Sequence, residues 1–310
     1  MPDKPIIRLE KISKKFHKKV ALEDISLEIP EGSFYGLIGL SGSGKTTLMN
    51  IMVGFWKQSS GKVYFQDKNL KRYKNTIRQM FGFATQAGSV YGRLTVAENL
   101  KYFGKLYNMS KSDIQKRIVE VLRLVDLVGV ENVLAKELST GMSRRLDIAC
   151  AMIHNPKILL LDEPTEDLDP VLRKEILALL KHINSQGTTI IMASHLLQEA
   201  EEVCDTMAII HKGRILSTGS PAQLKSKYSK RNEIHLRVSS GNYKKLGSKL
   251  EKEKLGEVII KRNKIVIYSE KDASILSRIL KIAKSSKEKV TELNFSKPGI
   301  EEIFEVATKQ

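Results

Sequence analysis

The stretch Gly39–Thr47 constrains the fold of this chain more than any other part of its sequence. It reads Gly-Leu-Ser-Gly-Ser-Gly-Lys-Thr-Thr and matches the pattern G-x-x-x-x-G-K-S/T. The glycines allow a tight turn in which consecutive backbone N–H groups can point at an anion. A run typical of a short buried strand, Ser33–Ile38, precedes it, and a run typical of a helix, Leu48–Val53, follows it. The stretch therefore predicts a strand, a phosphate-binding loop and a helix whose positive end faces the phosphates.

Two side chains of this loop carry specific chemistry. Lys45 can reach the terminal phosphates of a nucleotide, and the Thr46 hydroxyl can ligate Mg²⁺. A Gly- and Ser-rich surface loop is the alternative, but such loops rarely continue directly into a helix. An aromatic residue ahead of the loop, Phe16, could stack on a nucleotide base, although most phenylalanines belong to a core. The residues expected to contact nucleotide are Phe16, Gly39, Leu40, Ser41, Gly42, Ser43, Gly44, Lys45, Thr46 and Thr47.

Length and composition bound the class of protein. The 310 residues suggest a large domain and a smaller one, and 41% hydrophobic residues are enough to build a core. Cys150 and Cys204 have no His or Cys at metal-ligand spacing, which argues for a reducing compartment and against zinc. No apolar run approaches the roughly 18 residues that span a bilayer, and the N-terminus has no apolar signal core. We therefore expect a cytoplasmic protein whose role at a membrane would come from a partner.

The net charge of +17 is compatible with nucleic acid, an anionic membrane face or only a Lys-rich solvated surface. Lysines are spread along the whole chain and acids are interleaved with them, as in Glu251–Lys254. No block combines basic residues with regularly placed aromatics. This pattern favours the solvated surface, with membrane proximity next, and no nucleic-acid partner is expected.

A second constellation follows two apolar runs later in the chain. Ile158–Leu161 is typical of a strand buried on both faces, and Asp162 and Glu163 follow it directly. Ligands bind at the carboxyl ends of such strands, where Asp162 could hold Mg²⁺ through water and Glu163 could polarise an attacking water. An ordinary turn after a buried strand would be the simpler interpretation if no phosphate loop preceded it. The run Thr188–Ala193 ends near His195, which would lie at the same edge if the two strands are parallel neighbours.

The remaining segments predict an α/β chain in two parts. From about residue 87 to 153 helical patterns prevail: Thr95–Phe103 opens one helix, and Ser112 is a candidate cap of the next. A polar, Lys-rich linker is expected around Ser226–Arg231. Beyond it the strand and helix signals follow the order β-α-β-β-α-β of a ferredoxin-like unit, with a last short helix over Gly299–Val306.

With these elements in this order, the chain resembles the ATP-binding subunits of ABC transporters over about Ile6–Leu224. The segment Leu138–Ala149 looks like the ABC signature. Its Gly-Met-x-Arg-Arg-Leu-Asp continuation is similar to the drug-exporter subgroup typified by daunorubicin-resistance ATPases, and Lys297–Phe304 looks like the C-terminal end of those subunits. The fold that this implies is α/β: a P-loop NTPase with a RecA-like parallel sheet core, an antiparallel β subdomain and a helical insertion, plus a small α+β ferredoxin-like domain. The implied domains are an ABC ATPase domain at 1–228, with its helical subdomain at about 87–153, and an accessory domain at 229–310.

The resemblance implies a head-to-tail homodimer or heterodimer that binds two ATP molecules with Mg²⁺ between its subunits. Hydrolysis would drive export of a hydrophobic solute, drug or lipid through separate integral membrane permease subunits, with this chain peripheral on the inner face of the cell membrane. The helical segment would contact that partner, with Tyr91, Leu94, Tyr102 and Phe103 as candidates, although helix-core packing accounts for these side chains equally well.

Site residues carry over position by position. Phe16 would stack on adenine, and Mg²⁺ would be held by Thr46, Gln86 and Asp162. The catalytic residues would be Glu163, His195 and Gln86, with Glu163 acting on the attacking water and His195 bonding the γ-phosphate. The signature residues that would contact the partner's ATP are Ser139, Thr140, Gly141 and Met142, and Asp169 would lie on the loop at the dimer seam.

Two features depart from the family pattern. Thr140 stands where the first glycine of the signature is expected, which could restrict how closely that loop approaches phosphate. Glu166 and Asp167 replace the usual small pair ahead of Asp169, and their negative charge could slow closure around ATP. Neither change removes Glu163, so ATPase activity is expected.

Two further hypotheses stay open. The first is a soluble ABC-type ATPase acting on nucleic acid or the ribosome, suggested by the charge of +17 but disfavoured by the single phosphate loop and the absence of a heptad run from the sequence. The second makes the C-terminal unit a regulatory sensor, because ferredoxin-like folds serve many functions.

Overall fold

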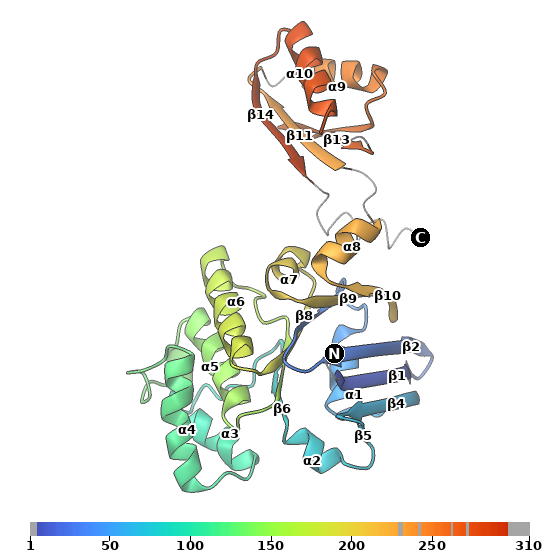
Figure 1. Ribbon diagram of the computed structural model, residues 1–310. Helices are drawn as coiled ribbons and strands as arrows, with labels where there is room; N and C mark the ends of the chain where they lie inside the picture. The colour runs from blue at the N-terminus through green and yellow to red at the C-terminus, as the bar shows by residue number, and fades with distance from the viewer. Residues whose placement is uncertain (1–4, 229–231, 241–242, 262, 271–272, 297–310) are drawn as a thin grey trace. The chain divides into compact units, whose positions relative to one another are not determined.

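The computed structural model describes residues 5–228, 232–240, 243–261, 263–270 and 273–296. By its internal contacts the chain separates into two units, Met1–Pro221 and Ala222–Gln310, each of which is described by itself below (Figure 1). The assignment of functions to residues 1–228 and 229–310 remains a prediction.

Two sheets form the framework of the first unit (Figure 1). One is antiparallel, with the order β2-β1-β4-β5. The other has the order β10-β9-β3-β8-β7-β6 and is parallel except for β10 at its edge. The strands are β1 (Pro5–Phe16), β2 (Lys19–Pro30), β3 (Phe34–Ile38), β4 (Ser60–Phe65), β5 (Lys68–Asn69), β6 (Phe81–Ala84), β7 (Ile158–Asp162), β8 (Thr189–Ser194), β9 (Thr206–His211) and β10 (Arg214–Gly219). The predicted parallel core and antiparallel β subdomain are therefore confirmed.

The strand order brings three functional segments to one edge of the parallel sheet. β8 lies between β3 and β7, and all three run in the same direction and are buried along their whole length. Their ends lie close to register: Ile38 pairs with Ser194, the last residue of β8, and Asp162 pairs with Ala193, one residue earlier. The phosphate loop, Glu163 and His195 consequently leave the sheet side by side, as the sequence predicted for parallel neighbours.

One hydrophobic core joins the two sheets. It contains apolar residues of β1, β2, β4 and the parallel strands together with one face of α1 (Lys45–Met52), which begins directly after the phosphate loop. The other helices of this part are the short α2 (Lys74–Arg78), α6 (Pro170–Ser185) and α7 (Leu197–Val203). Within the described residues, no helix is long and apolar enough to cross a membrane.

The predicted helical insertion is present between β6 and β7. It comprises α3 (Val96–Leu106), α4 (Lys111–Leu124), the 3₁₀ turn η1 (Ala135–Glu137) and α5 (Thr140–Met152). Thr95 caps α3 in a reciprocal capping box with Glu98. The prediction that Ser112 caps α4 is wrong: Ser110, in an extended conformation, accepts the Asp113 N–H at 3.1 Å, so Ser112 lies inside the first turn.

Two titratable groups, the buried Asp147 and the half-buried His154, hold the end of this insertion to its surroundings. Asp147 accepts the backbone N–H of Ser89 at 2.8 Å, and burial raises its pKa to about 6. His154 stacks on the ring of Tyr107, with ring centroids 3.4 Å apart, and contacts the carbonyl of Phe81 at 3.1 Å. Burial lowers the pKa of His154 to about 4. The fold therefore favours the neutral form of both groups, one of which is an acid and the other a base.

These two groups should give the stability of the first unit opposing responses to acid. Between its ordinary pKa of 6.5 and about 4, His154 is protonated in the unfolded chain first, so it destabilises the fold as the pH falls. Between about 6 and its ordinary 3.8, Asp147 is protonated in the folded chain first, so it stabilises the fold as the pH falls. Asp147→Asn removes only the second contribution and should steepen acid destabilisation by up to about 1.4 kcal/mol per pH unit. Thermal unfolding between about pH 7 and about pH 4.5 measures this, and profiles parallel to the wild type would contradict it.

The second unit has the predicted ferredoxin-like fold. Its elements follow in the order β11 (Asn232–Val238), α9 (Tyr243–Lys252), β12 (Glu257–Lys261), β13 (Lys264–Ser269), α10 (Ile275–Ser285) and β14 (Val290–Ser296). The strands pair antiparallel in the order β12-β13-β11-β14, and both helices pack on one face around a separate apolar core (Figure 1). The expected linker over Ser226–Arg231 is corrected in part, because α8 (Pro221–Tyr228) includes its first residues. The expected helix over Gly299–Val306 and the tail Lys297–Phe304 lie outside the described residues.

Candidate functional site

The phosphate loop needs its glycines for two different physical reasons. A Cβ at Gly39 would lie 2.3 Å from the carbonyl oxygen of Ile210 and 2.6 Å from the hydroxyl of Ser43, so the space there is filled. Gly44 has φ +113°, and its Cβ would lie 2.8 Å from a methyl group of Leu22. Gly42 also has a positive φ of +77° but has open space around it. The loop is therefore fitted against β9 and β2 at its ends and free at its tip, where Leu40, Ser41 and Gly42 are exposed.

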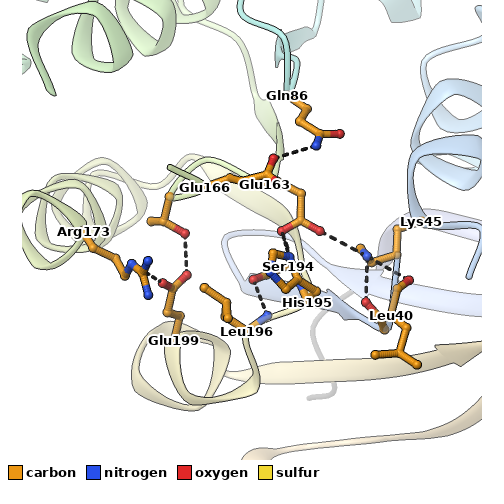
Figure 2. A network of polar contacts seen from close by, with 12 residues as sticks. Leu40, Lys45, Gln86, Glu163, Glu166, Arg173, Ser194, His195, Leu196 and Glu199 are labelled. Atoms are coloured by element: carbon orange, nitrogen blue, oxygen red, sulfur yellow. Dashed lines mark hydrogen bonds and ion pairs between the residues drawn. The ribbon is translucent and has the colours of Figure 1, made fainter. Parts of the chain in front are cut away.

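Lys45 is buried at the start of α1 and faces the end of β7. Its ammonium donates to the carbonyl of Gly39 at 2.7 Å and lies 3.1 Å from the Oε1 atom of Glu163 (Figure 2). A buried ammonium is stable only with such partners. A phosphate in the loop would offer Lys45 a second anion at the same place, so nucleotide binding is expected to compete with the Lys45–Glu163 pair.

Glu163 connects the loop to the end of β8. Its backbone has φ +50°, a left-handed conformation that costs a residue with a Cβ about 1–2 kcal/mol, and its N–H donates to the carbonyl of Ala193 at 2.9 Å. Its Oε2 atom accepts the backbone N–H of His195 at 3.2 Å and lies 2.8 Å from Nδ1 of that ring (Figure 2). Because an ionised carboxylate only accepts, Nδ1 carries the proton in this contact.

Thr46, Gln86 and Asp162, the three expected ligands of Mg²⁺, line one cavity of about 370 Å³ together with Asn50, Phe83, Thr85 and Ala87. Asp162 is buried, and burial is the main cause that raises its pKa, against a hydrogen bond from Thr46 that lowers it. In the part of the chain that the structure describes, its Oδ1 atom has no hydrogen-bond partner. A buried carboxylate oxygen among hydroxyl and amide groups suits a hard divalent cation, so these residues fit Mg²⁺.

Phe16 lies at the end of β1 and is 37% exposed, so it is not a core residue. Its ring and the ring of Trp56 make a T-shaped contact, with centroids 5.1 Å apart, and the ammonium of Lys14 lies over the Phe16 ring, 4.7 Å from its centre. The backbone N–H of Trp56 donates to the carbonyl of Asn50 in α1. Trp56 was not predicted from the sequence, where its only signal is that it is the chain's one tryptophan and follows the predicted helix closely.

The signature residues form the start of α5. Ser139 caps the helix by accepting the N–H of Met142 at 3.3 Å, and Thr140 is exposed beside it. Gly141 is buried against α6, where its Cβ would lie 2.8 Å from a methyl group of Leu172. Asp169 caps α6 in turn, by accepting the N–H of Leu172 at 3.0 Å and that of the preceding residue. The signature and Asp169 thus lie at the beginnings of two packed helices, and none of them lines the cavity above.

A buried contact that was not predicted from the sequence fastens the segment after Glu163. Thr165 donates its hydroxyl to Glu199 of α7. The guanidinium of Arg173 in α6 lies 3.1 Å from the same carboxylate (Figure 2). Burial raises the pKa of Glu199, while Thr165 and Arg173 lower it. The sequence offers no signal for this contact, because Thr165 and Glu199 are 34 residues apart and belong to different elements.

Known proteins with similar sequences decide the family. A family model described as ABC transporter matches residues 22–166. The linearmycin resistance ATP-binding protein LnrL of Bacillus subtilis (strain 168) is 30% identical over 301 residues, which are 96% of this chain and 97% of that protein. The chain belongs to the ABC transporter ATP-binding proteins. A second ABC protein of the same organism, YdbJ, described as uncharacterised, is 40% identical over 212 residues, 68% of each chain.

Solved structures support the same ABC assignment. CbiO1 of Clostridium perfringens, described as part of the ABC transporter complex cbiONQ, has a TM-score of 0.67 at 26% identity, covering 73% of this chain and 92% of that one. The bacterial ABC transporter cassette MJ0796, described as dimeric, has a TM-score of 0.63 at 29% identity, covering 69% and 98%. The first unit is therefore a P-loop NTPase domain, and this ABC protein is an ATPase that binds nucleotide.

Proposed function

We propose that this chain is the ATP-hydrolysing subunit of an ABC exporter. Two such subunits would bind MgATP between them and drive a hydrophobic solute, drug or lipid outward through separate membrane subunits. The observation that carries the proposal is the edge of the parallel sheet, where the expected Mg²⁺ ligands line one cavity and Glu163 contacts both Lys45 and His195.

The positions of these residues support a role for each. The loop N–H groups and Lys45 would neutralise phosphate oxygens, and Glu163 would orient and polarise the water that attacks the γ-phosphate. Mg²⁺, held through Thr46, Gln86 and Asp162, would supply further neutralisation of the phosphate charge. His195 would bond the γ-phosphate while its Nδ1 atom stays on Glu163. Phosphoryl transfer needs this kind of positioning and charge compensation more than covalent help.

The adenine is expected at the ring of Phe16. The surface position of that ring supports stacking, and the T-shaped contact places Trp56 directly beside it. Because Trp56 is the only tryptophan of the chain, its fluorescence would report the arrival of a base at Phe16.

The dimer is expected to bring the start of α5 to the ATP of the other subunit. Ser139 and Thr140 are exposed at a helix N-terminus, which attracts phosphate through its N–H groups and dipole. Asp169, at the start of the packed helix α6, would lie on the same interface. The similar cassette MJ0796, which is described as dimeric, supports a two-subunit arrangement.

The proposals of export and of a membrane partner are supported by similar proteins and by one cluster of surface side chains. The likeness to the linearmycin resistance protein extends over both units, and the Escherichia coli protein YbhF, described as a probable multidrug ABC transporter ATP-binding protein, is 31% identical over 225 residues, or 39% of its length. The rings of Tyr91, Tyr102 and Phe103 form a cluster in which both tyrosines are exposed. We propose that this cluster contacts the membrane subunits, which would hold the chain at the inner face of the membrane.

Ser139→Ala tests the shared site. We expect turnover to fall by about 10- to 100-fold, because a hydroxyl bonded to a charged phosphate is lost, while nucleotide binding measured by Trp56 fluorescence stays near wild type. Ser110→Ala is the matched control, since Ser110 also caps its helix, α4, by accepting the backbone N–H three residues later. Equal turnover in the two variants would rule out the shared site.

A further inference from the structure

The segment after Glu163 carries a carboxylate that points at Gln86. The Oε2 atom of Glu166 accepts the side-chain N–H of Gln86 at 2.6 Å (Figure 2). The backbone N–H of Glu166 donates to the carbonyl of Glu163 at 3.2 Å, which holds this carboxylate in a turn. The two side chains are 80 residues apart in the sequence. They meet because β6, which precedes Gln86, pairs with β7, which precedes Glu166.

The contact fixes which way the Gln86 amide faces. An ionised carboxylate only accepts hydrogen bonds, so the NH₂ group must face Glu166 and the carbonyl oxygen must face away. Figure 2 shows that oxygen turned from Glu166 toward the side of Lys45 and α1. Gln86 also lines the cavity that contains Thr46 and Asp162. With its NH₂ group on Glu166, its carbonyl oxygen is the atom that can ligate a cation in that cavity.

We propose that Glu166 is a positioning residue that holds the oxygen of Gln86 toward Mg²⁺ and thereby sets the metal affinity of the nucleotide site. This inference rests on the proposed function, in which Gln86 is a metal ligand. Groups that hydrogen-bond a metal ligand orient it before the ion arrives, and their loss weakens metal binding by about 10- to 100-fold. Gln86 is an exposed side chain on a loop, so it has the most orientational freedom to lose among the three ligands.

Glu166 also adds a charge near the cation. Its carboxylate contacts the expected ligand Gln86 directly, at 2.6 Å. The charge and the orientation of the amide therefore favour the same outcome, and an experiment has to separate them. Asp167 supplies the means, because it carries the same charge one residue later, and its φ of +61° is a conformation that Asn adopts as readily as Asp.

The test is the binding of Mn²⁺, as a spectroscopic substitute for Mg²⁺, to the protein saturated with ADP. Electron paramagnetic resonance measures the free Mn²⁺ at each point of a titration. Glu166→Gln, whose amide no longer dictates the orientation of Gln86, should raise the half-saturating Mn²⁺ concentration by about 10-fold. ADP binding in EDTA, measured by Trp56 fluorescence, should not change. Asp167→Asn should shift the Mn²⁺ curve much less than Glu166→Gln.

A double substitution makes the mechanism specific. If Glu166 acts through Gln86, then Glu166→Gln added to Gln86→Ala should change Mn²⁺ binding no further than Gln86→Ala alone. Additive effects, or equal effects of Glu166→Gln and Asp167→Asn, would overturn the inference.

Asp162→Asn distinguishes this failure from a failure of the proposed function. If Asp162→Asn weakens Mn²⁺ binding and Glu166→Gln leaves it unchanged, only the role of Glu166 is lost. If neither affects it, the metal site itself is misplaced, and the inference falls with the proposed function.

Discussion

Glu163→Gln is expected to lower ATP turnover by about 10²- to 10⁴-fold while nucleotide still binds. The substitution keeps the size of the side chain but removes the charge that would polarise the attacking water. The same charge faces the Lys45 ammonium at 3.1 Å and the ring of His195 at 2.8 Å. Without it the buried Lys45 lacks an ionised partner, at a cost of about 3 kcal/mol, until a phosphate takes that place. The variant should therefore unfold at a lower temperature than the wild type without nucleotide, and ATP should stabilise it more.

Three measurements check this expectation. Phosphate release gives turnover, thermal unfolding with and without ATP gives the two stabilities, and the mass in solution shows whether the variant holds ATP as a dimer. Glu202→Gln, the same change at an exposed position of α7, should leave all three near wild type. Turnover above a tenth of the wild type, or a monomer at high protein and ATP concentrations, would contradict the assigned role of Glu163.

Gly39→Ala should weaken nucleotide binding strongly. The added methyl group would lie 2.3 Å from the carbonyl oxygen of Ile210 in β9, and strand backbone cannot move aside as a flexible side chain can. The loop must shift instead. This shift would move Ser43 and the Gly39 carbonyl, which accepts a hydrogen bond from the Lys45 ammonium. Overpacking of this kind costs about 1–3 kcal/mol or more, so we expect affinity to fall by at least about 100-fold.

Gly42→Ala is the matched control for this prediction. Its φ of +77° makes alanine unfavourable by about 1–2 kcal/mol, but its Cβ would meet nothing within 4 Å. It therefore carries backbone strain without a clash and should lower the unfolding temperature while nucleotide still binds. Trp56 fluorescence measures binding in both variants, and circular dichroism confirms that both are folded. Similar affinities for the two would show that space around Gly39 does not control the loop.

The sequence predicted the elements whose chemistry is local. The phosphate loop follows from glycine spacing, and β7 and β8 follow from apolar runs long enough to be buried on both faces. The order β-α-β-β-α-β of the second unit was readable because each of its helices has one apolar face. Asp162 and Glu163 could be assigned because ligands bind at the carboxyl ends of parallel strands, and the phosphate loop had already indicated a nucleotide there.

The contacts that depend on distant pairing could not be predicted. Nothing in the sequence indicates that Glu166 accepts a hydrogen bond from Gln86, or that Glu199 accepts one from Thr165. Each pair is brought together by strand order and by helix packing. The cap of α4 was missed for a different reason. Ser110 and Ser112 are both suitable residues two positions apart, and only the extended backbone at Ser110 decides between them.

The buried carboxylate of Glu199 lies between two helices that each begin beside a residue of the expected site. Glu199 belongs to α7, which begins just after His195. Its carboxylate lies 3.1 Å from the guanidinium of Arg173 in α6, which begins just after Asp169. His195, expected to bond the γ-phosphate, and Asp169, expected at the dimer interface, thus lie at the starts of two helices that meet at Glu199. If the two helices move together, hydrolysis of the two nucleotides expected in a dimer would be coupled.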